Sequence, residues 1–221
     1  MEVKIVQNVM AANDLLAQEL REVFTRKNIF VINLLSSPGA GKTSLLEETI
    51  KRLKGDYQIA VIEGDIAGDH DARRIAALGI PVVQINTGGT CHLDARMVKS
   101  ALVELDLTLV HALFIENVGN LVCPASFKLG EDLRAVILST PEGNDKVKKY
   151  PLAFRESQAA VINKVDLLSH VDFDLDQTRR DIRDINTQSE IFALSCKTGE
   201  GLDFWVDYIK GKIQGSTLRA G

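Results

Sequence analysis

Short apolar runs alternate with amphipathic stretches along almost the whole chain. The runs are rich in β-branched residues and nearly free of charge, and they lie at 29–35, 59–63, 82–85, 112–115, 135–139, 159–162 and 191–194. Strands need this composition when helices cover both faces of their sheet. Between the runs, apolar residues recur at helical spacing over 42–53, 72–78, 93–105, 177–185 and 202–213. The alternation predicts an α/β fold, with a mostly parallel β-sheet flanked by α-helices.

The first 27 residues carry a separate amphipathic pattern. Apolar side chains recur there at helical spacing with charged residues between them, namely Val9, Leu16, Leu20, Val23 and Phe24. We predict that residues 1–27 contain a helix that packs on the following domain. Residues 28–214 contain no internal repeat, low-complexity tract or linker, which favours a single domain, and residues 215–221 are predicted to fray.

Composition and charge exclude several classes of protein. With 45% apolar and 25% charged residues among 221, the chain is globular and long enough to bury its own core. Its 26 Lys and Arg against 30 Asp and Glu give a net charge of -4, so it offers no large electropositive surface to nucleic acid. No apolar run approaches the roughly 18 residues of a membrane helix, and the N-terminal residues lack the order of a signal peptide. We therefore expect a cytoplasmic protein that binds neither nucleic acid nor membranes.

A glycine-containing loop follows the first apolar run and opens a helical stretch. It reads Ser36-Ser37-Pro38-Gly39-Ala40-Gly41-Lys42-Thr43. This is the context of a phosphate-binding loop, in which backbone N–H groups surround phosphate oxygens, Lys42 reaches the β- and γ-phosphates and the Thr43 hydroxyl ligates Mg²⁺. The usual pattern has glycine at the place of Ser36, but an ordinary strand-to-helix turn remains the weaker interpretation. We assign the following residues to nucleotide binding: Pro38, Gly39, Ala40, Gly41, Lys42, Thr43 and Ser44.

Two later loops bear on the base of the nucleotide. In Asn163-Lys164-Val165-Asp166, Asp166 can accept both N–H donors of the guanine edge while the Lys164 stem lies against the ring. Adenine has no such donor pair. The loop Ser195-Cys196-Lys197-Thr198-Gly199 follows the last run and can place a backbone N–H on guanine O6. An isolated NKVD string is an ordinary turn as often as a base reader, but three such loops at strand ends favour GTP.

Acidic residues also stand at predicted strand ends. Asp65 follows the second run and Glu116 the fourth, with Gly119 three residues later. We predict that Asp65 holds Mg²⁺ or positions the attacking water, that Glu116 binds in the outer shell of Mg²⁺, and that the Gly119 N–H contacts the γ-phosphate. Together with Lys42 they form the predicted catalytic set. The helix dipole alone explains the acidic residues at the next helix start, Asp69 and Asp71, which are weaker candidates.

Cysteine and histidine gather in two segments. Cys91-His92 lies shortly after the third run, and Cys123 lies four residues beyond Gly119. Thiolate and imidazole donors suit Ni²⁺ or Zn²⁺, and three donors leave a coordination position open. Each cysteine taken alone is more often a small buried hydrophobe, but the place of Cys123 beside the predicted γ-phosphate contact favours a ligand. We leave the Cys196 thiol outside the metal site.

These motifs resemble those of a known family, the HypB-type nickel-incorporation GTPases of hydrogenase maturation, within a larger group that includes urease accessory GTPases. The resemblance extends from Asn33 to Trp205 and rests on NLLSSPGAGKT, EGDIAGDHDA, NTGGTCHLDA, ENVGNLVCPA, STPEGNDKVKKYP, NKVD and SCKTGEG. CHLDA is the most specific of these strings, because the urease relatives carry Cys-Pro-His instead. A loop such as SSPGAGKT also fits the family pattern.

The resemblance implies a P-loop GTPase that uses Mg²⁺ and serves as a metallochaperone, helping to deliver nickel to the large subunit of nickel–iron hydrogenase. It implies that Cys91, His92 and Cys123 ligate Ni²⁺, Zn²⁺ or both. It further implies a homodimer in the GTP-bound state, with the metal clusters near the interface, and two other partners, a second nickel chaperone and the hydrogenase large-subunit precursor. The family's CxxCGC motif and His-rich tract are absent from this sequence, and its four histidines exclude bulk nickel storage.

Other hypotheses stay open. A GTPase chaperone of a cobalamin-dependent mutase shares the fold and NKxD, a GTP-gated dimerisation module needs thiols only to pack an interface, and an ATP-dependent enzyme can use the same phosphate loop. The Lys-rich stretch 141–151 is either a solvated loop or places a lysine on the nucleotide or partner subunit. Under the favoured hypothesis, GTP orders Gly119 and thereby brings Cys123 to Cys91 and His92, and hydrolysis loosens that site.

Overall fold

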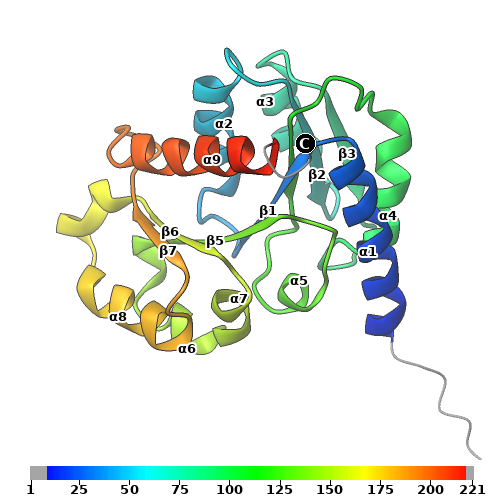
Figure 1. Ribbon diagram of the computed structural model, residues 1–221. Coiled ribbons are helices and arrows are strands. Elements are labelled where there is room, and N and C mark those ends of the chain that lie inside the picture. Colours follow the sequence, from blue (N-terminus) through cyan, green and yellow to red (C-terminus); the bar gives the residue numbers. More distant parts are fainter. Residues whose placement is uncertain (1–8, 218–221) are drawn as a thin grey trace, which may run out of the picture.

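The computed structural model describes residues 9–217, and one seven-stranded sheet forms their centre (Figure 1). The strands are β1 Phe30–Ser36, β2 Ile59–Asp65, β3 Val82–Asn86, β4 Ala112–Glu116, β5 Leu133–Ser139, β6 Ala159–Asn163 and β7 Glu190–Ala193. They lie in the order β3-β2-β4-β1-β5-β6-β7, and each neighbouring pair is parallel. The predicted α/β fold class is confirmed.

Helices connect the strands and cover both faces of the sheet (Figure 1). The longer helices are α1 Val9–Arg26, α2 Lys42–Leu53, α8 Leu175–Ile185 and α9 Leu202–Thr217. The shorter ones are α3 His70–Ala76, α4 Ala95–Ala101, α5 Cys123–Ser126, α6 Lys146–Lys149 and α7 Pro151–Arg155. Three 3₁₀-helices also connect these elements: η1 Leu102–Glu104, η2 Thr140–Glu142 and η3 Val165–His170.

Successive residues of a strand point to opposite faces, and helices cover both. In β1, Ile32 and Leu34 pack in one cluster with α2 and α9, whereas Val31 packs with α1 and α4 on the other side. A third cluster around Phe154 joins α5 to α8 with β5 and β6. Because both faces are buried, the central strands contain apolar residues without alternation, which is why the sequence marks them so clearly.

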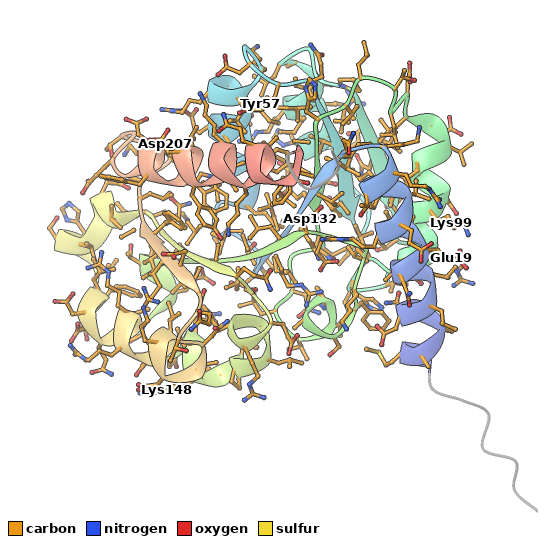
Figure 2. The ribbon with its side chains drawn as sticks, viewed as in Figure 1. Glu19, Tyr57, Lys99, Asp132, Lys148 and Asp207 are labelled. Carbon is orange, nitrogen blue, oxygen red and sulfur yellow. The ribbon has the colours of Figure 1, made fainter. Side chains whose placement is uncertain are left out.

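Helix α1 packs beside α4 at one side of the sheet. Leu20 and Phe24 of α1 are buried in the shared cluster. At the surface, Glu19 of α1 and Lys99 of α4 form an ion pair at 2.8 Å and lie next to each other in Figure 2. The described part of the chain contains no helix with the length and apolarity needed to cross a membrane.

Some boundaries differ from the sequence prediction. Helix α9 continues to Thr217, so residues 215–217 are helical where a frayed tail is predicted, and the rest of that predicted tail lies outside the described residues. The Lys-rich stretch 141–151 folds into η2, α6 and the start of α7, because Val147 inserts into the third cluster. The helix expected over 93–105 begins only at Ala95, after Asp94 caps it.

The loops that carry predicted site residues all leave the carboxyl ends of parallel strands. The phosphate loop follows β1, and Asp65 closes β2. The Cys91-His92 segment follows β3, and Glu116 closes β4. The two loops predicted to read the base, residues 163–166 and 195–199, follow β6 and β7, and we call them the first and second base-reading loops. Since all of these strands are parallel, their carboxyl ends share one edge of the sheet, where ligands bind in folds of this kind.

Candidate nucleotide and metal site

The phosphate loop is tied to the first base-reading loop. Gly39 and Gly41 have positive φ angles of 78° and 95°, which residues with a side chain rarely adopt. A Cβ atom on Gly41 would also clash with Asn163 Nδ2, which donates a hydrogen bond to the Ala40 carbonyl at 2.9 Å. Lys164 Nζ donates to the Gly39 carbonyl at 2.7 Å. The two loops therefore form one rigid cradle.

Two adjoining cavities follow this cradle. The first, of about 440 Å³, is lined by the phosphate loop together with Glu63, Asp65, Asp71, Arg74 and Gly119. The second, of about 330 Å³, is lined by the two base-reading loops, including Asn163, Asp166, Ser195, Cys196 and Lys197. Gly41, Ser44 and Lys164 line both cavities. The pair can hold the phosphates of a nucleotide in the first cavity and its base in the second.

Glu116 forms hydrogen bonds with two side chains of the phosphate loop. Its Oε1 accepts hydrogen bonds from Lys42 Nζ at 3.0 Å and from Thr43 Oγ1 at 2.7 Å. The side chain is fully buried, and its Oε2 has no hydrogen-bond partner among residues 9–217. A buried carboxylate with an unused oxygen beside a threonine hydroxyl is the kind of oxygen donor set that Mg²⁺ prefers. Glu116 and Thr43 therefore fit a Mg²⁺ site at this point.

Glu63 is a candidate site residue that sequence reasoning missed. It lies on β2, is 3% exposed, and its Oε2 also lacks a partner within the described residues. Carboxylate oxygens of Glu63, Asp71 and Glu116 lie within 4.8 Å of one another. Burial, followed by the charge of Glu116, raises the pKa of Glu63 to about 8 despite the opposing charge of Lys42. The feature of the sequence that could identify Glu63 is that it is an acidic residue in the otherwise apolar run 59–63.

Asp65 lines the phosphate cavity, but its carboxylate turns back to the chain. Asp65 Oδ1 accepts a hydrogen bond from the Ile66 N–H at 2.5 Å, and Asp65 is not part of the carboxylate group around Glu116. Asp71, which the sequence treats as a weaker candidate, does belong to that group. The geometry therefore places Glu63 and Asp71, rather than Asp65, next to Glu116.

Because Glu63 is buried, we predict that the stability of the protein decreases as the pH rises. Its folded pKa of about 8 exceeds the ordinary value of 4.5, so between these values the folded protein retains a proton that the unfolded chain has released. This contribution to stability is complete below pH 4.5 and is lost as the pH rises through 8. Without nucleotide and with a chelator, we expect the free energy of unfolding to fall by roughly 2 to 3 kcal/mol from pH 6 to pH 8.5.

Glu63→Gln should remove most of this fall, because glutamine stays neutral throughout the pH range. Urea unfolding of both proteins at the two pH values measures the difference, and the other titrating groups cancel in the comparison. Equal pH dependence in the wild type and the variant would contradict the assignment.

A short chain of hydrogen bonds positions the base-reading residues. Ser195 Oγ donates to Asp166 Oδ1 at 2.6 Å and accepts from the Lys197 N–H at 3.2 Å. Asn163 Oδ1 accepts from the Cys196 N–H at 3.3 Å, so both ends of that carboxamide join loops. Burial raises the pKa of the Cys196 thiol to about 12, in keeping with its omission from the predicted metal site.

The predicted metal ligands come together within one chain. The ligand atoms of Cys91, His92 and Cys123 lie within 4.8 Å of one another, and each side chain is half-buried. Burial lowers the pKa of His92 against the charge of Asp94, which favours the neutral imidazole that metals bind. Two thiols and one imidazole fit a borderline-soft ion such as Ni²⁺ or Zn²⁺. We call residues 87–94 the first metal loop and residues 117–129 the second metal loop.

A buried ion pair supports the second metal loop. Arg134, on β5, pairs with Glu131 at 2.6 Å, and the two side chains are 6% and 8% exposed. The Arg134 guanidinium also donates to the carbonyls of Ala125 and Phe127 at 2.7 and 3.0 Å. The Phe127 ring stacks on His92 with 3.9 Å between ring centroids. Arg134 thus supports both α5 and the aromatic neighbour of a predicted ligand, which sequence spacing does not reveal.

Asn13 of helix α1 bridges the two metal loops. Its Oδ1 accepts a hydrogen bond from the N–H of Ala95, directly after the first metal loop, at 2.8 Å. Its Nδ2 donates to the Lys128 carbonyl in the second metal loop at 2.9 Å. With 6% exposure, this bridge is shielded from water. The N-terminal helix therefore contributes to the framework of the metal cluster as well as to the core.

The chain is similar to known proteins over most of its length. The family described as CobW/HypB/UreG, nucleotide-binding domain, matches residues 30–193. Hydrogenase maturation factor HypB of Azotobacter vinelandii is 49% identical over 98% of this chain and 71% of its own length. The Escherichia coli K12 protein of the same name is 47% identical over 95% of this chain and 72% of its own.

Solved structures give the same result. HypB from Helicobacter pylori, crystallised in complex with nickel, has a TM-score of 0.88 at 37% identity and covers 93% of this chain and 97% of its own. Hydrogenase maturation factor HypB from Archaeoglobus fulgidus has a TM-score of 0.86 at 38% identity and covers 92% and 99%. The phosphate loop, the two loops predicted to read the base and this similarity over nearly the whole chain lead to the same family. The chain belongs to the CobW/HypB/UreG family and, within it, to the HypB-type hydrogenase maturation GTPases.

Proposed function

We propose that this protein hydrolyses GTP to GDP and phosphate with Mg²⁺ and uses that cycle to bind and release Ni²⁺ during nickel–iron hydrogenase maturation. The observation that carries the proposal is that one short segment reaches both sites. Glu116 contacts Lys42 and Thr43 of the phosphate loop, and Cys123, seven residues later, meets Cys91 and His92. A change at one end of so short a segment acts directly on the other.

The phosphate cavity supplies the groups that hydrolysis requires. Backbone N–H groups of the phosphate loop and Lys42 bind the β- and γ-phosphates, while Asp166 and the Ser195 loop bind guanine. Thr43, Glu116 and Glu63 would hold Mg²⁺, which when bound neutralises charge on the phosphate oxygens. We also propose that Asp65, which lines the same cavity, orients the attacking water. We expect slow turnover, since Arg74, which lines this cavity, is paired with Glu47 and Asp71 rather than free to act as an arginine finger.

Gly119 is the proposed γ-phosphate sensor. A Cβ atom on Gly119 would lie 3.2 Å from Pro38 Cγ and 3.3 Å from Pro38 N, so the chain passes directly against the phosphate loop. A γ-phosphate that binds the Gly119 N–H stabilises this arrangement, and its departure releases the segment that carries Cys123. Converting a mostly closed metal site fully to a mostly open one would require about 5.5 kcal/mol of differential affinity, whereas a partial shift worth about 1.4 kcal/mol already changes Ni²⁺ affinity about tenfold.

The proposed partners follow from the open coordination and the relatives. Three protein donors leave at least one position for a ligand from a second molecule. We propose a homodimer in the GTP-bound state, a second nickel chaperone that docks on it, and the hydrogenase large-subunit precursor as the recipient. Relatives at 47–49% identity carry the name hydrogenase maturation factor, which supports this role. Zn²⁺ competes for the same donors.

Nickel affinity in two nucleotide states tests the proposal. We expect Ni²⁺ to bind at least about tenfold more tightly with a non-hydrolysable GTP analogue than with GDP, a usual size for coupling between two sites. Cys91→Ala should abolish binding at this site in both states. Cys196→Ala is the matched control, because it removes a thiol that lies outside the cluster; since Cys196 lines the base cavity, both nucleotides are supplied at saturating concentration. Equal Ni²⁺ affinities of the wild type in both states would refute nucleotide gating.

A further inference from the structure

Residues in the segment from Glu116 to Cys123 alternately contact the phosphate loop and the first metal loop. Glu116 binds Lys42 and Thr43, whereas the next residue, Asn117, accepts a hydrogen bond from the Leu93 N–H at 3.1 Å. Gly119 lies against Pro38, whereas the next residue, Asn120, donates from Nδ2 to the Cys91 carbonyl at 3.2 Å. Each contact with the nucleotide side is thus followed by a contact with the metal side.

The two asparagines differ in their freedom to move. Asn117 is fully buried, also accepts from its own following N–H at 3.0 Å, and donates to Asn33 Oδ1 at 3.4 Å. It forms a fixed anchor between β4, β1 and the first metal loop. Asn120 is half-buried and accepts from the N–H of Val122, the residue directly before Cys123, at 2.9 Å. Asn120 therefore joins the backbone of Cys91 to that of the residue before Cys123.

We infer that Asn120 is a positioning residue that couples the γ-phosphate contact at Gly119 to the metal cluster. The inference rests on the proposed nucleotide gating and names the side chain that transmits it. Because neighbouring Cα atoms lie about 3.8 Å apart, a displacement of Gly119 from Pro38 moves Asn120 with it. The carboxamide then loses its hold on the Cys91 carbonyl while Asn117 keeps Leu93 in place. The sulfur atoms of Cys91 and Cys123 separate as a result.

Two substitutions of Asn120 test this coupling. Asn120→Ala removes both hydrogen-bonding groups, and Asn120→Asp keeps an acceptor for the Val122 N–H but cannot donate to the Cys91 carbonyl. We expect the ratio of Ni²⁺ affinities between the GTP-analogue and GDP states to fall from about tenfold to less than about twofold in both variants. Absorption from thiolate-to-nickel charge transfer should persist in both nucleotide states, since all three ligands remain. Loss of that absorption in both states would instead indicate a merely structural role and overturn the inference.

Asn186→Ala is the matched control. Asn186 also donates through Nδ2 to backbone carbonyls, those of Phe154, Arg155 and Ser157, but it lies at the end of α8, before β7 begins. It should retain the wild-type ratio. If the wild type binds Ni²⁺ more tightly in the GTP-analogue state and both Asn120 variants keep the same ratio of affinities, the role of Asn120 is refuted while the proposed function stands. If the wild type itself binds Ni²⁺ equally tightly in both nucleotide states, the gating proposal fails, and the coupling role fails with it.

Discussion

Asp166→Asn is expected to weaken GTP binding by about 10²- to 10⁴-fold, because two hydrogen bonds from guanine to a charged acceptor are worth roughly 1.5 to 3 kcal/mol each. Ser195 holds Asp166 at the mouth of the base cavity, so an asparagine there would keep its place while presenting one acceptor and one donor. Xanthine has a carbonyl where guanine has its amino group. The same variant should therefore bind xanthosine triphosphate more tightly than GTP.

Competition of GTP, xanthosine triphosphate and ATP against a fluorescent nucleotide measures this change in preference. Asp172→Asn, at an exposed position in the loop before α8, is the control and should leave GTP binding unaltered. If Asp166→Asn leaves the nucleotide preference unchanged, Asp166 does not bind the base, and the alternative of an ATP-dependent enzyme regains support.

Arg134→Met is expected to lower the free energy of unfolding by about 3 to 5 kcal/mol. Burial alone would raise the pKa of Glu131, but Arg134 and the Leu129 N–H outweigh it and hold the pKa below its usual range. Without Arg134, Glu131 is a buried charge without a counter-ion. The carbonyls of Ala125 and Phe127 lose their donor as well, so the second metal loop loosens and Ni²⁺ affinity falls.

The double variant Arg134→Met, Glu131→Gln separates the two causes. Glutamine removes the unpaired charge but can still accept from the Leu129 N–H, so we expect it to restore about half of the lost stability. It should not restore Ni²⁺ affinity, because the carbonyls of the second metal loop remain without their donor. Urea unfolding and nickel titration provide the two measurements. A loss below about 1 kcal/mol in the single variant would show that this ion pair does not support the loop.

The strands of the sheet could be predicted because their apolar composition is visible in each short stretch of sequence. Central strands such as β1 and β4 are covered on both faces, so their apolar runs stand out from the amphipathic helices between them. The small helices α6 and α7 could not be predicted in this way. Helix α6 has three lysines around one buried side chain, Val147, and α7 has only five residues, of which Ala153 and Phe154 are buried. These buried side chains matter only once β5 and β6 have formed.

The motif residues of the site follow from the same rule, since parallel strands deliver their loops to one edge. The rule places Lys42, Glu116 and Asp166 at that edge but cannot determine which carboxylates face each other across it. Glu63 joins Glu116 because neighbouring strands β2 and β4 pair these two residues in register. Such a pairing depends on strand order, which spacing along one chain does not contain. The asparagine contacts of the metal loops were out of reach for the same reason.

The bridge made by Asn13 has a practical consequence for anyone who shortens this protein. A fragment trimmed to start at residue 28 would keep every residue predicted to contact guanine or phosphate, yet the Ala95 N–H and the Lys128 carbonyl would lose their common partner. We therefore expect the smallest piece able to bind nucleotide and the smallest piece able to hold nickel firmly to differ in length. Truncation studies that score only nucleotide binding would overlook the difference.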